Sequence, residues 1–117
     1  MKKNHTSFPK RDRLRNRSEF IELTEVGRRV SNDLFVLMYR ETDTGPKIGI
    51  TVTKKVGNAV VRNRIKRSVR EVFRSLSERE RPPMEMNVIA KTAAATASFQ
   101  EMNVSLQDLF ARIIGTW

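Results

Sequence analysis

The segment KKVGNAVVRNRIKRSVREVFR, residues 54–74, combines dense positive charge with evenly spaced aliphatic residues. It holds eight Lys or Arg and one acid, and Asn58 is a residue type that commonly caps the N-terminus of a helix. We therefore predict a helix from Asn58 to about Ser77, ended by Pro82 and Pro83. At about 100° per residue, one apolar stripe of this helix is expected to be buried: Val61, Ile65, Val69, Val72 and Leu76.

The opposite side of the same helix is basic. Its centre consists of Asn63, Lys66, Arg67, Arg70 and Arg74, with Arg62 and Arg64 on the two flanks. A solvated helix face normally mixes both signs of charge, whereas here only Glu71 is close enough to neutralise the cations. Arginine binds phosphate through two parallel hydrogen bonds and stacks on bases, so this side of the helix favours a nucleic-acid partner.

Two β-rich runs precede this helix. Residues 34–40 (LFVLMYR) and 47–53 (KIGITVT) are separated by ETDTGP, whose Asp, Gly and Pro favour a turn, so we predict a hairpin. In the second run Ile48, Ile50 and Val52 alternate with polar residues and Gly, which predicts one core face and one open face. The first run is apolar on both faces, which fits either an outer face that meets a partner or a strand covered on both sides.

The remaining elements complete the predicted fold. Ser18 caps a predicted short helix that stops at Gly27, and residues 85–91 form a further predicted strand. Ser98 and Glu101 have the spacing of a capping box, before a terminal helix with an apolar face of Met102, Leu106, Leu109 and Ile113. The order α, β, β, α, β, α predicts an α+β fold, a two-layer α/β sandwich of helices packed on one sheet.

The length and the charge distribution set the domain organisation. At 117 residues the chain fits one domain, and we expect a flexible basic arm over residues 1–17 and a single domain over residues 18–117. The net charge is +10, of which residues 2–17 carry +6 and residues 54–74 carry +7, leaving −3 on the rest. The absence of cysteine excludes disulfides and thiolate metal sites, and no run is long and apolar enough for a membrane span. We expect a soluble, cytoplasmic protein.

The residue types of a protein active site are not evident in this sequence. The one histidine, His5, lies in the basic arm, the acids are scattered, and there is no G-x-x-x-x-G-K-[ST] loop, so we expect no catalytic and no metal-binding residues. RNA is favoured over DNA, because reading a major groove needs Asn or Gln among the arginines and only Asn63 qualifies. A membrane surface ranks last, since the sheet needs the apolar side of the helix.

The run KKVGNAVVRNRIKRSVREVFR, with RLRNRSEF at residues 13–20, resembles the protein subunit of bacterial ribonuclease P. RNRIKR resembles the RNR motif of that family, and the likeness runs from about Arg13 to Trp117. The resemblance implies a subunit that binds the catalytic RNA and the 5′ leader of precursor tRNA, while the RNA removes the leader with Mg²⁺ held mainly by the RNA subunit. It also implies the order αβββαβα, with an additional strand around Arg29 to Asn32 and a left-handed crossover around the RNR helix.

The resemblance also assigns candidate site residues. Those expected to bind the catalytic RNA are Lys54, Lys55, Arg62, Asn63, Arg64, Lys66, Arg67 and Arg70. The cleft for the leader is expected to consist of Phe20, Val36, Met38 and Thr51. Thr24 and Met38 stand where the family commonly has aromatic residues, so contact with leader bases is expected to be weaker or to rely more on charge.

Alternative interpretations exist for one residue and for the whole chain. Phe20 fits the leader cleft, but it also fits packing of the first helix on the sheet. A general RNA-binding or ribosome-associated protein of similar fold, without a role in tRNA processing, is the alternative function, and a DNA-binding module ranks third.

Overall fold

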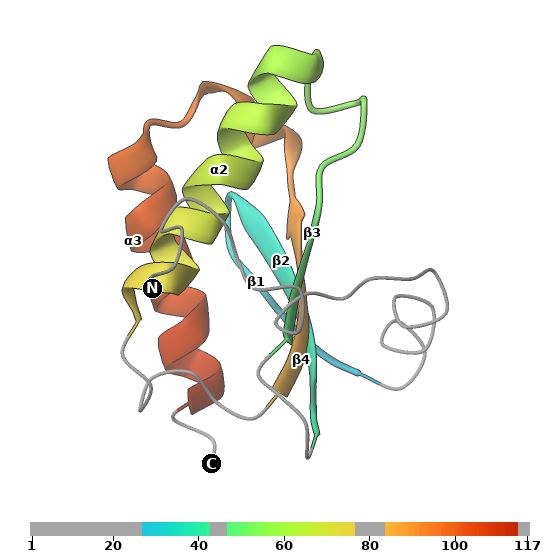
Figure 1. Ribbon diagram of the computed structural model, residues 1–117, viewed down its shortest axis with the longest axis vertical. Coiled ribbons are helices and arrows are strands. Elements are labelled where there is room, and N and C mark those ends of the chain that lie inside the picture. The colour runs from blue at the N-terminus through green and yellow to red at the C-terminus, as the bar shows by residue number, and fades with distance from the viewer. Residues whose placement is uncertain (1–26, 43–46, 77–83, 115–117) are drawn as a thin grey trace, which may run out of the picture.

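The computed structural model describes residues 27–42, 47–76 and 84–114 of the chain. Their elements follow in the order β1 (Arg28–Ser31), β2 (Phe35–Glu41), β3 (Lys47–Thr51), α2 (Ala59–Ser75), β4 (Met84–Ala90), the short 3₁₀ helix η3 (Thr92–Thr96) and α3 (Phe99–Ile114). Helices α2 and α3 cover one face of a four-stranded sheet (Figure 1). The α+β class is as predicted, whereas the expected arm at 1–17 and helix at 18–26 lie outside the described residues.

The sheet has the strand order β1-β2-β4-β3, with β4 antiparallel to β2 and parallel to β3. The predicted hairpin between residues 34–40 and 47–53 is therefore wrong, because β4 lies between these two strands. Burial explains the difference. Residues 35–39 of β2 and 84–88 of β4 are all buried, so both strands need a neighbour on each side, whereas β3 is less buried and takes an edge.

A hairpin forms instead between β1 and β2, in which Val30 lies opposite Leu37. Asn32 shapes its turn, since Asn32 Oδ1 accepts hydrogen bonds from the N–H groups of Leu34 and Phe35 at 3.2 and 3.1 Å. The Asn32 N–H in turn donates to the Phe35 carbonyl at 3.0 Å. Strand β1 is the additional strand that the family resemblance implies around Arg29 to Asn32.

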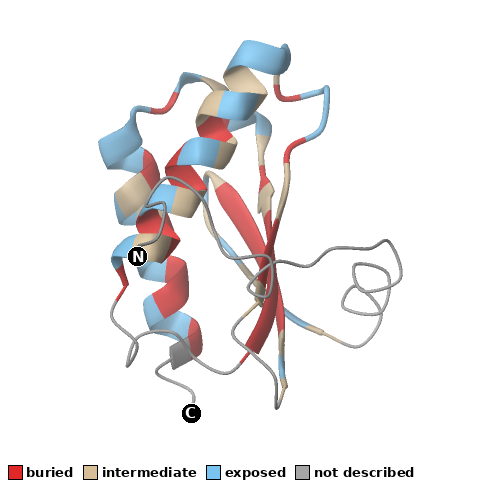
Figure 2. Ribbon diagram, viewed as in Figure 1, coloured by how far each residue is buried: buried red, intermediate tan, exposed pale blue. Residues whose placement is uncertain are grey.

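Helix α2 begins where the sequence predicts, because Asn58 Oδ1 accepts a hydrogen bond from the Val61 N–H at 3.0 Å. It ends at Ser75, two residues before the predicted end. Four residues of the predicted apolar stripe are buried and Val61 is partly buried against the same core (Figure 2). Phe73, which the stripe omits, is also buried, and its ring meets that of Phe110 edge to face with 6.2 Å between centroids.

The predicted capping box of α3 is present. The Glu101 N–H donates to Ser98 Oγ at 3.0 Å, and the Ser98 N–H donates to Glu101 Oε1 at 2.8 Å. The predicted apolar face of α3, Met102, Leu106, Leu109 and Ile113, is fully buried. The preceding helix η3 is not predicted, because its sequence TAAAT has no apolar periodicity.

The chain passes from β3 through α2 into β4, which lies parallel to β3 and next to it in the sheet. This is the kind of crossover that the resemblance implies. Its left-handedness stays a prediction.

Candidate nucleic-acid interface

The outward side of α2 and the loop before it form a surface that we call the basic face: Lys54, Lys55, Arg62, Asn63, Lys66, Arg67 and Arg70. Four of these residues are exposed, and Arg62, Lys66 and Arg70 are half-buried (Figure 2). No acid occurs between Val52 and Arg70, and the first acid of the helix, Glu71, forms an ion pair with Arg74. The positive charges of this face repel one another unless a polyanion binds them.

The loop before α2 is packed closely against the first turns of the helix. Val56 is buried, and its N–H donates to the Thr53 carbonyl at 3.0 Å. A Cβ at Gly57 would lie 2.9 Å from Val61 Cγ1, so a side chain there would force the loop away from the helix. Arg62 Nε donates to the Gly57 carbonyl at 3.2 Å. The two lysines of this loop are thereby held beside the positive N-terminus of α2.

Arg64 stands apart from the other predicted RNA-binding residues. Its Nη1 donates to the Ala97 carbonyl at 2.9 Å and its Nη2 donates to the Ala95 carbonyl at 2.7 Å. Both carbonyls lie at the corner between η3 and α3, and the Arg64 side chain is half-buried there. One arginine of the RNR motif therefore joins α2 to this corner through both terminal nitrogens, whereas Asn63 and Arg67 face solvent.

Replacing Arg64 by Ala is expected to lower the free energy of unfolding by about 1–3 kcal/mol, because two carbonyl oxygens lose a charged donor. Urea denaturation followed by circular dichroism measures this change. Arg67→Ala, on the same helix but exposed, is the matched control and is expected to change stability by about 0.5 kcal/mol or less. Equal stabilities of the two variants would contradict the packing role of Arg64.

The face of the sheet opposite the helices is a second candidate surface, which we call the outer sheet face: Val36, Met38, Thr51, Asn87 and Ile89. The strand register places them together, because Val36 and Thr51 lie on either side of Ile89, and Met38 lies beside Asn87. Val36, Met38 and Ile89 form an apolar cluster separate from the main core. Three of the predicted cleft residues thus come together, and Phe20 lies outside the described residues.

Two polar side chains of β4 lie on the same face and are buried. Glu85 Oε1 accepts from Arg40 Nε at 2.8 Å and from Arg40 Nη2 at 2.7 Å. Asn87 Oδ1 accepts from Thr51 Oγ1 at 3.0 Å. These β4 residues are not among the predicted site residues, although the alternation in EMNVIAK places Glu85, Asn87 and Ile89 on one face of the strand.

Two further properties concern the described residues alone. None of their acidic and histidine side chains gather into a group of three or more that could hold a metal ion. None of their helices is long and apolar enough to cross a membrane.

Comparison with known proteins identifies relatives along most of the chain. The family model described as Ribonuclease P matches residues 8–114. A ribonuclease P protein component of Desulfatibacillum aliphaticivorans is 44% identical over 108 residues, which are 92% of each chain. One from Geotalea uraniireducens is 42% identical over 108 residues, covering 92% of this chain and 95% of the relative.

Solved structures show the same fold. The ribonuclease P protein of Staphylococcus aureus superposes with a TM-score of 0.81 at 29% identity, covering 87% of this chain and 94% of that one. The ribonuclease P protein of Thermotoga maritima gives a TM-score of 0.78 at 30% identity, covering 86% of this chain and 96% of that one.

Proposed function

This chain belongs to the bacterial ribonuclease P protein family, and we propose that its basic face binds the catalytic RNA while its outer sheet face binds the 5′ leader of precursor tRNA. The protein is the protein subunit of ribonuclease P, a component of the endoribonuclease that matures tRNA 5′ ends, and it associates with the ribonuclease P RNA. The alternatives of a general RNA-binding protein and of a DNA-binding module are thereby set aside.

One observation carries the assignment of the RNA surface: the basic face presents six cations and one amide with no acid among them. Arg67 and Lys66 project from consecutive positions of α2, and Lys54 and Lys55 extend this charge to the helix N-terminus. Phosphate oxygens are the groups that such a surface binds most strongly, through charge and through paired hydrogen bonds. Arg64 contributes to this surface indirectly, because its two hydrogen bonds hold the η3–α3 corner against α2.

The outer sheet face supports a different contact. Its apolar cluster consists of Val36 and Met38, which are buried, and the partly buried Ile89. In this proposal an unpaired base packs against that cluster, and a Met sulfur is a favourable neighbour for an aromatic ring. Thr51 and Asn87 add hydrogen-bonding groups beside that cluster. A single-stranded leader has unpaired bases, which suits this combination.

We assign the Mg²⁺ of the reaction to the RNA subunit. The described residues offer no group of acids that would hold the ion, and the cations of the basic face repel it. In this proposal the protein contributes binding and positioning, and it supplies no catalytic residue.

The leader assignment predicts a preference that depends on the protein. Holoenzyme reconstituted from this chain and a bacterial ribonuclease P RNA is expected to bind precursor tRNA about fivefold or more tightly than mature tRNA, since one packed base contributes about 1 kcal/mol or more. Equilibrium binding at fixed salt, with the RNA alone as the control, measures this ratio. The same ratio with and without the protein would contradict a leader contact by this chain.

A further inference from the structure

The centre of the outer sheet face contains the buried side-chain amide of Asn87. In the described part of the chain only its oxygen has a hydrogen-bond partner. Asn87 lies in β4, a central strand of the sheet (Figure 1), and its side chain is 5% exposed. Its Oδ1 accepts a hydrogen bond from Thr51 Oγ1 at 3.0 Å. Its Nδ2 carries two N–H donors, and in the described part of the chain neither has an acceptor.

An amide donor that is buried without an acceptor destabilises the protein, so native proteins rarely keep one. Within the described residues, the neighbours of Asn87 do not supply an acceptor for its Nδ2. Met38 and Gly49 lie beside Asn87 in the register and offer no oxygen or nitrogen acceptor in their side chains, and the carboxylate of Glu85 is held by Arg40. A strand position in an apolar face accepts Val or Ile without this cost. The polar side chain at this position is therefore explained better by a role in binding than by a contribution to stability.

The surroundings of Asn87 indicate what its acceptor is. The apolar cluster beside it consists of Val36 and Met38, which are 7% and 9% exposed, and the partly buried Ile89. Apolar side chains and a Met sulfur suit packing against the flat face of a nucleobase. A base lying there would bring its edge, with its ring nitrogens and carbonyl oxygens, toward the Asn87 amide. The Thr51 hydroxyl fixes the amide with its oxygen on one side, so that the nitrogen is the group left to donate.

We propose that Asn87 is a specificity-determining residue that reads one base of the 5′ leader, by donating from Nδ2 to an acceptor on the edge of that base. This inference rests on the proposed binding of the leader to the outer sheet face. Two kinds of acceptor have the required chemistry, a purine N7 and a base carbonyl oxygen. A hydrogen bond to a phosphate oxygen instead would give affinity without base preference.

The test measures base preference along the leader. Holoenzyme carrying the wild-type chain or Asn87→Leu competes for precursor tRNAs with randomised leaders, and sequencing of the cleaved products gives relative kcat/KM values. Leu has the same number and branching of side-chain heavy atoms as Asn and removes the donor. The ratio between best and worst base is expected to fall about fivefold at one leader position and to stay unchanged at the others, as loss of one hydrogen bond implies.

Two controls separate this role from a structural one. Asn103→Leu, the same replacement on α3, is expected to leave base preference unchanged at every position. Precursor tRNA with a 7-deaza purine at the affected position removes N7 alone. If N7 is the acceptor, wild type loses the preference and Asn87→Leu shows no further loss; a carbonyl acceptor leaves the wild-type preference intact. Should Asn87→Leu fold poorly, Asn87→Val removes the donor with a residue that strands favour.

The outcomes are distinguishable. The proposed role of Asn87 would be overturned if base preference were unchanged in both Asn87 variants or absent from wild type. In that case, a retained preference for precursor over mature tRNA would leave the proposed leader binding in place. Loss of that precursor preference in wild type would overturn both.

Discussion

Replacing Lys66 and Arg67 together by Gln is expected to weaken binding of the ribonuclease P RNA by roughly 25- to 60-fold at about 0.1 M salt. Both residues lie on the basic face, and neither makes a hydrogen bond or an ion pair with the described part of the chain. Their charges are therefore available to phosphates. Each lost phosphate contact lowers the magnitude of the log–log salt slope by about 0.7–0.9, so the slope is expected to fall by about 1.4–1.8.

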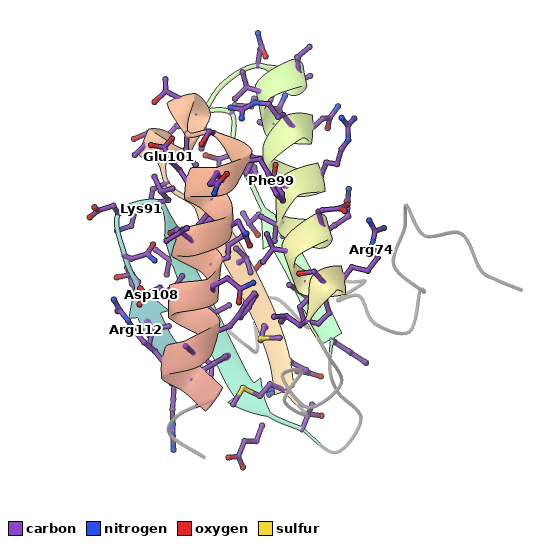
Figure 3. The ribbon with its side chains drawn as sticks, turned by 90° about the vertical axis from the view of Figure 1, so that its left-hand side faces the viewer. Arg74, Lys91, Phe99, Glu101, Asp108 and Arg112 are labelled. Atoms are coloured by element: carbon purple, nitrogen blue, oxygen red, sulfur yellow. The ribbon has the colours of Figure 1, made fainter. Side chains whose placement is uncertain are left out.

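The matched control for this double variant removes the same total charge from another part of the protein. Arg28 lies on the edge strand β1, and Lys91 follows β4. Figure 3 shows Lys91 on the side of the molecule away from Arg74 of α2. Arg28→Gln with Lys91→Gln is expected to change the salt slope by less than about 0.5, which long-range charge alone would produce. Filter binding over a range of salt concentrations measures both slopes, and equal losses in the two variants would contradict a localised RNA surface.

Replacing Phe73 by Ala is expected to lower the free energy of unfolding by about 3–5 kcal/mol. The ring is 1% exposed, and it packs against Phe110 at the contact between α2 and α3. Its removal leaves a cavity between the two helices and takes away an edge-to-face aromatic pair. A domain of this size is stabilised by only about 5–15 kcal/mol, so the variant is expected to unfold at a much lower urea concentration.

Phe99→Ala is the control for this second variant. It makes the same replacement at the start of α3, where the ring is 46% exposed, and the expected change is about 1 kcal/mol or less. Phe73→Ala that unfolds at the same urea concentration as Phe99→Ala would contradict the placement of Phe73 at the centre of the helix contact. Because Phe73 is buried and carries no charge, folded Phe73→Ala is expected to keep the salt slope of wild type.

Local signals in the sequence predicted α2 and α3 well. Asn58 and the pair of Ser98 and Glu101 cap their helices through side-chain hydrogen bonds that depend on neighbouring residues only, and the periodicity of α2 separates its apolar stripe from its basic face. Pairing of strands depends on residues far apart in the chain. The turn formers between β2 and β3 indicate a reversal, but they carry no information that β4 enters between the two strands.

The candidate site was predictable to a similar degree. A helical wheel places Arg64 on a flank of the basic face, but only the folded chain brings the carbonyls of Ala95 and Ala97 to its guanidinium. Likewise, alternation in β4 indicates that Asn87 and Ile89 share a face, whereas the register decides that Met38 and Thr51 lie beside them. The residue types were visible in the sequence, and their partners required the tertiary structure.

Directed cleavage from a single attached group tests whether the basic face binds the catalytic RNA. The chain has no cysteine, so Val60→Cys on α2 and Val104→Cys on α3 each provide one attachment point for iron–EDTA. Both valines are largely exposed, and neither change alters a charge. We expect localised hydroxyl-radical cleavage of the ribonuclease P RNA from position 60 and only background cleavage from position 104. Cleavage of equal strength from both positions, or from position 104 alone, would contradict it.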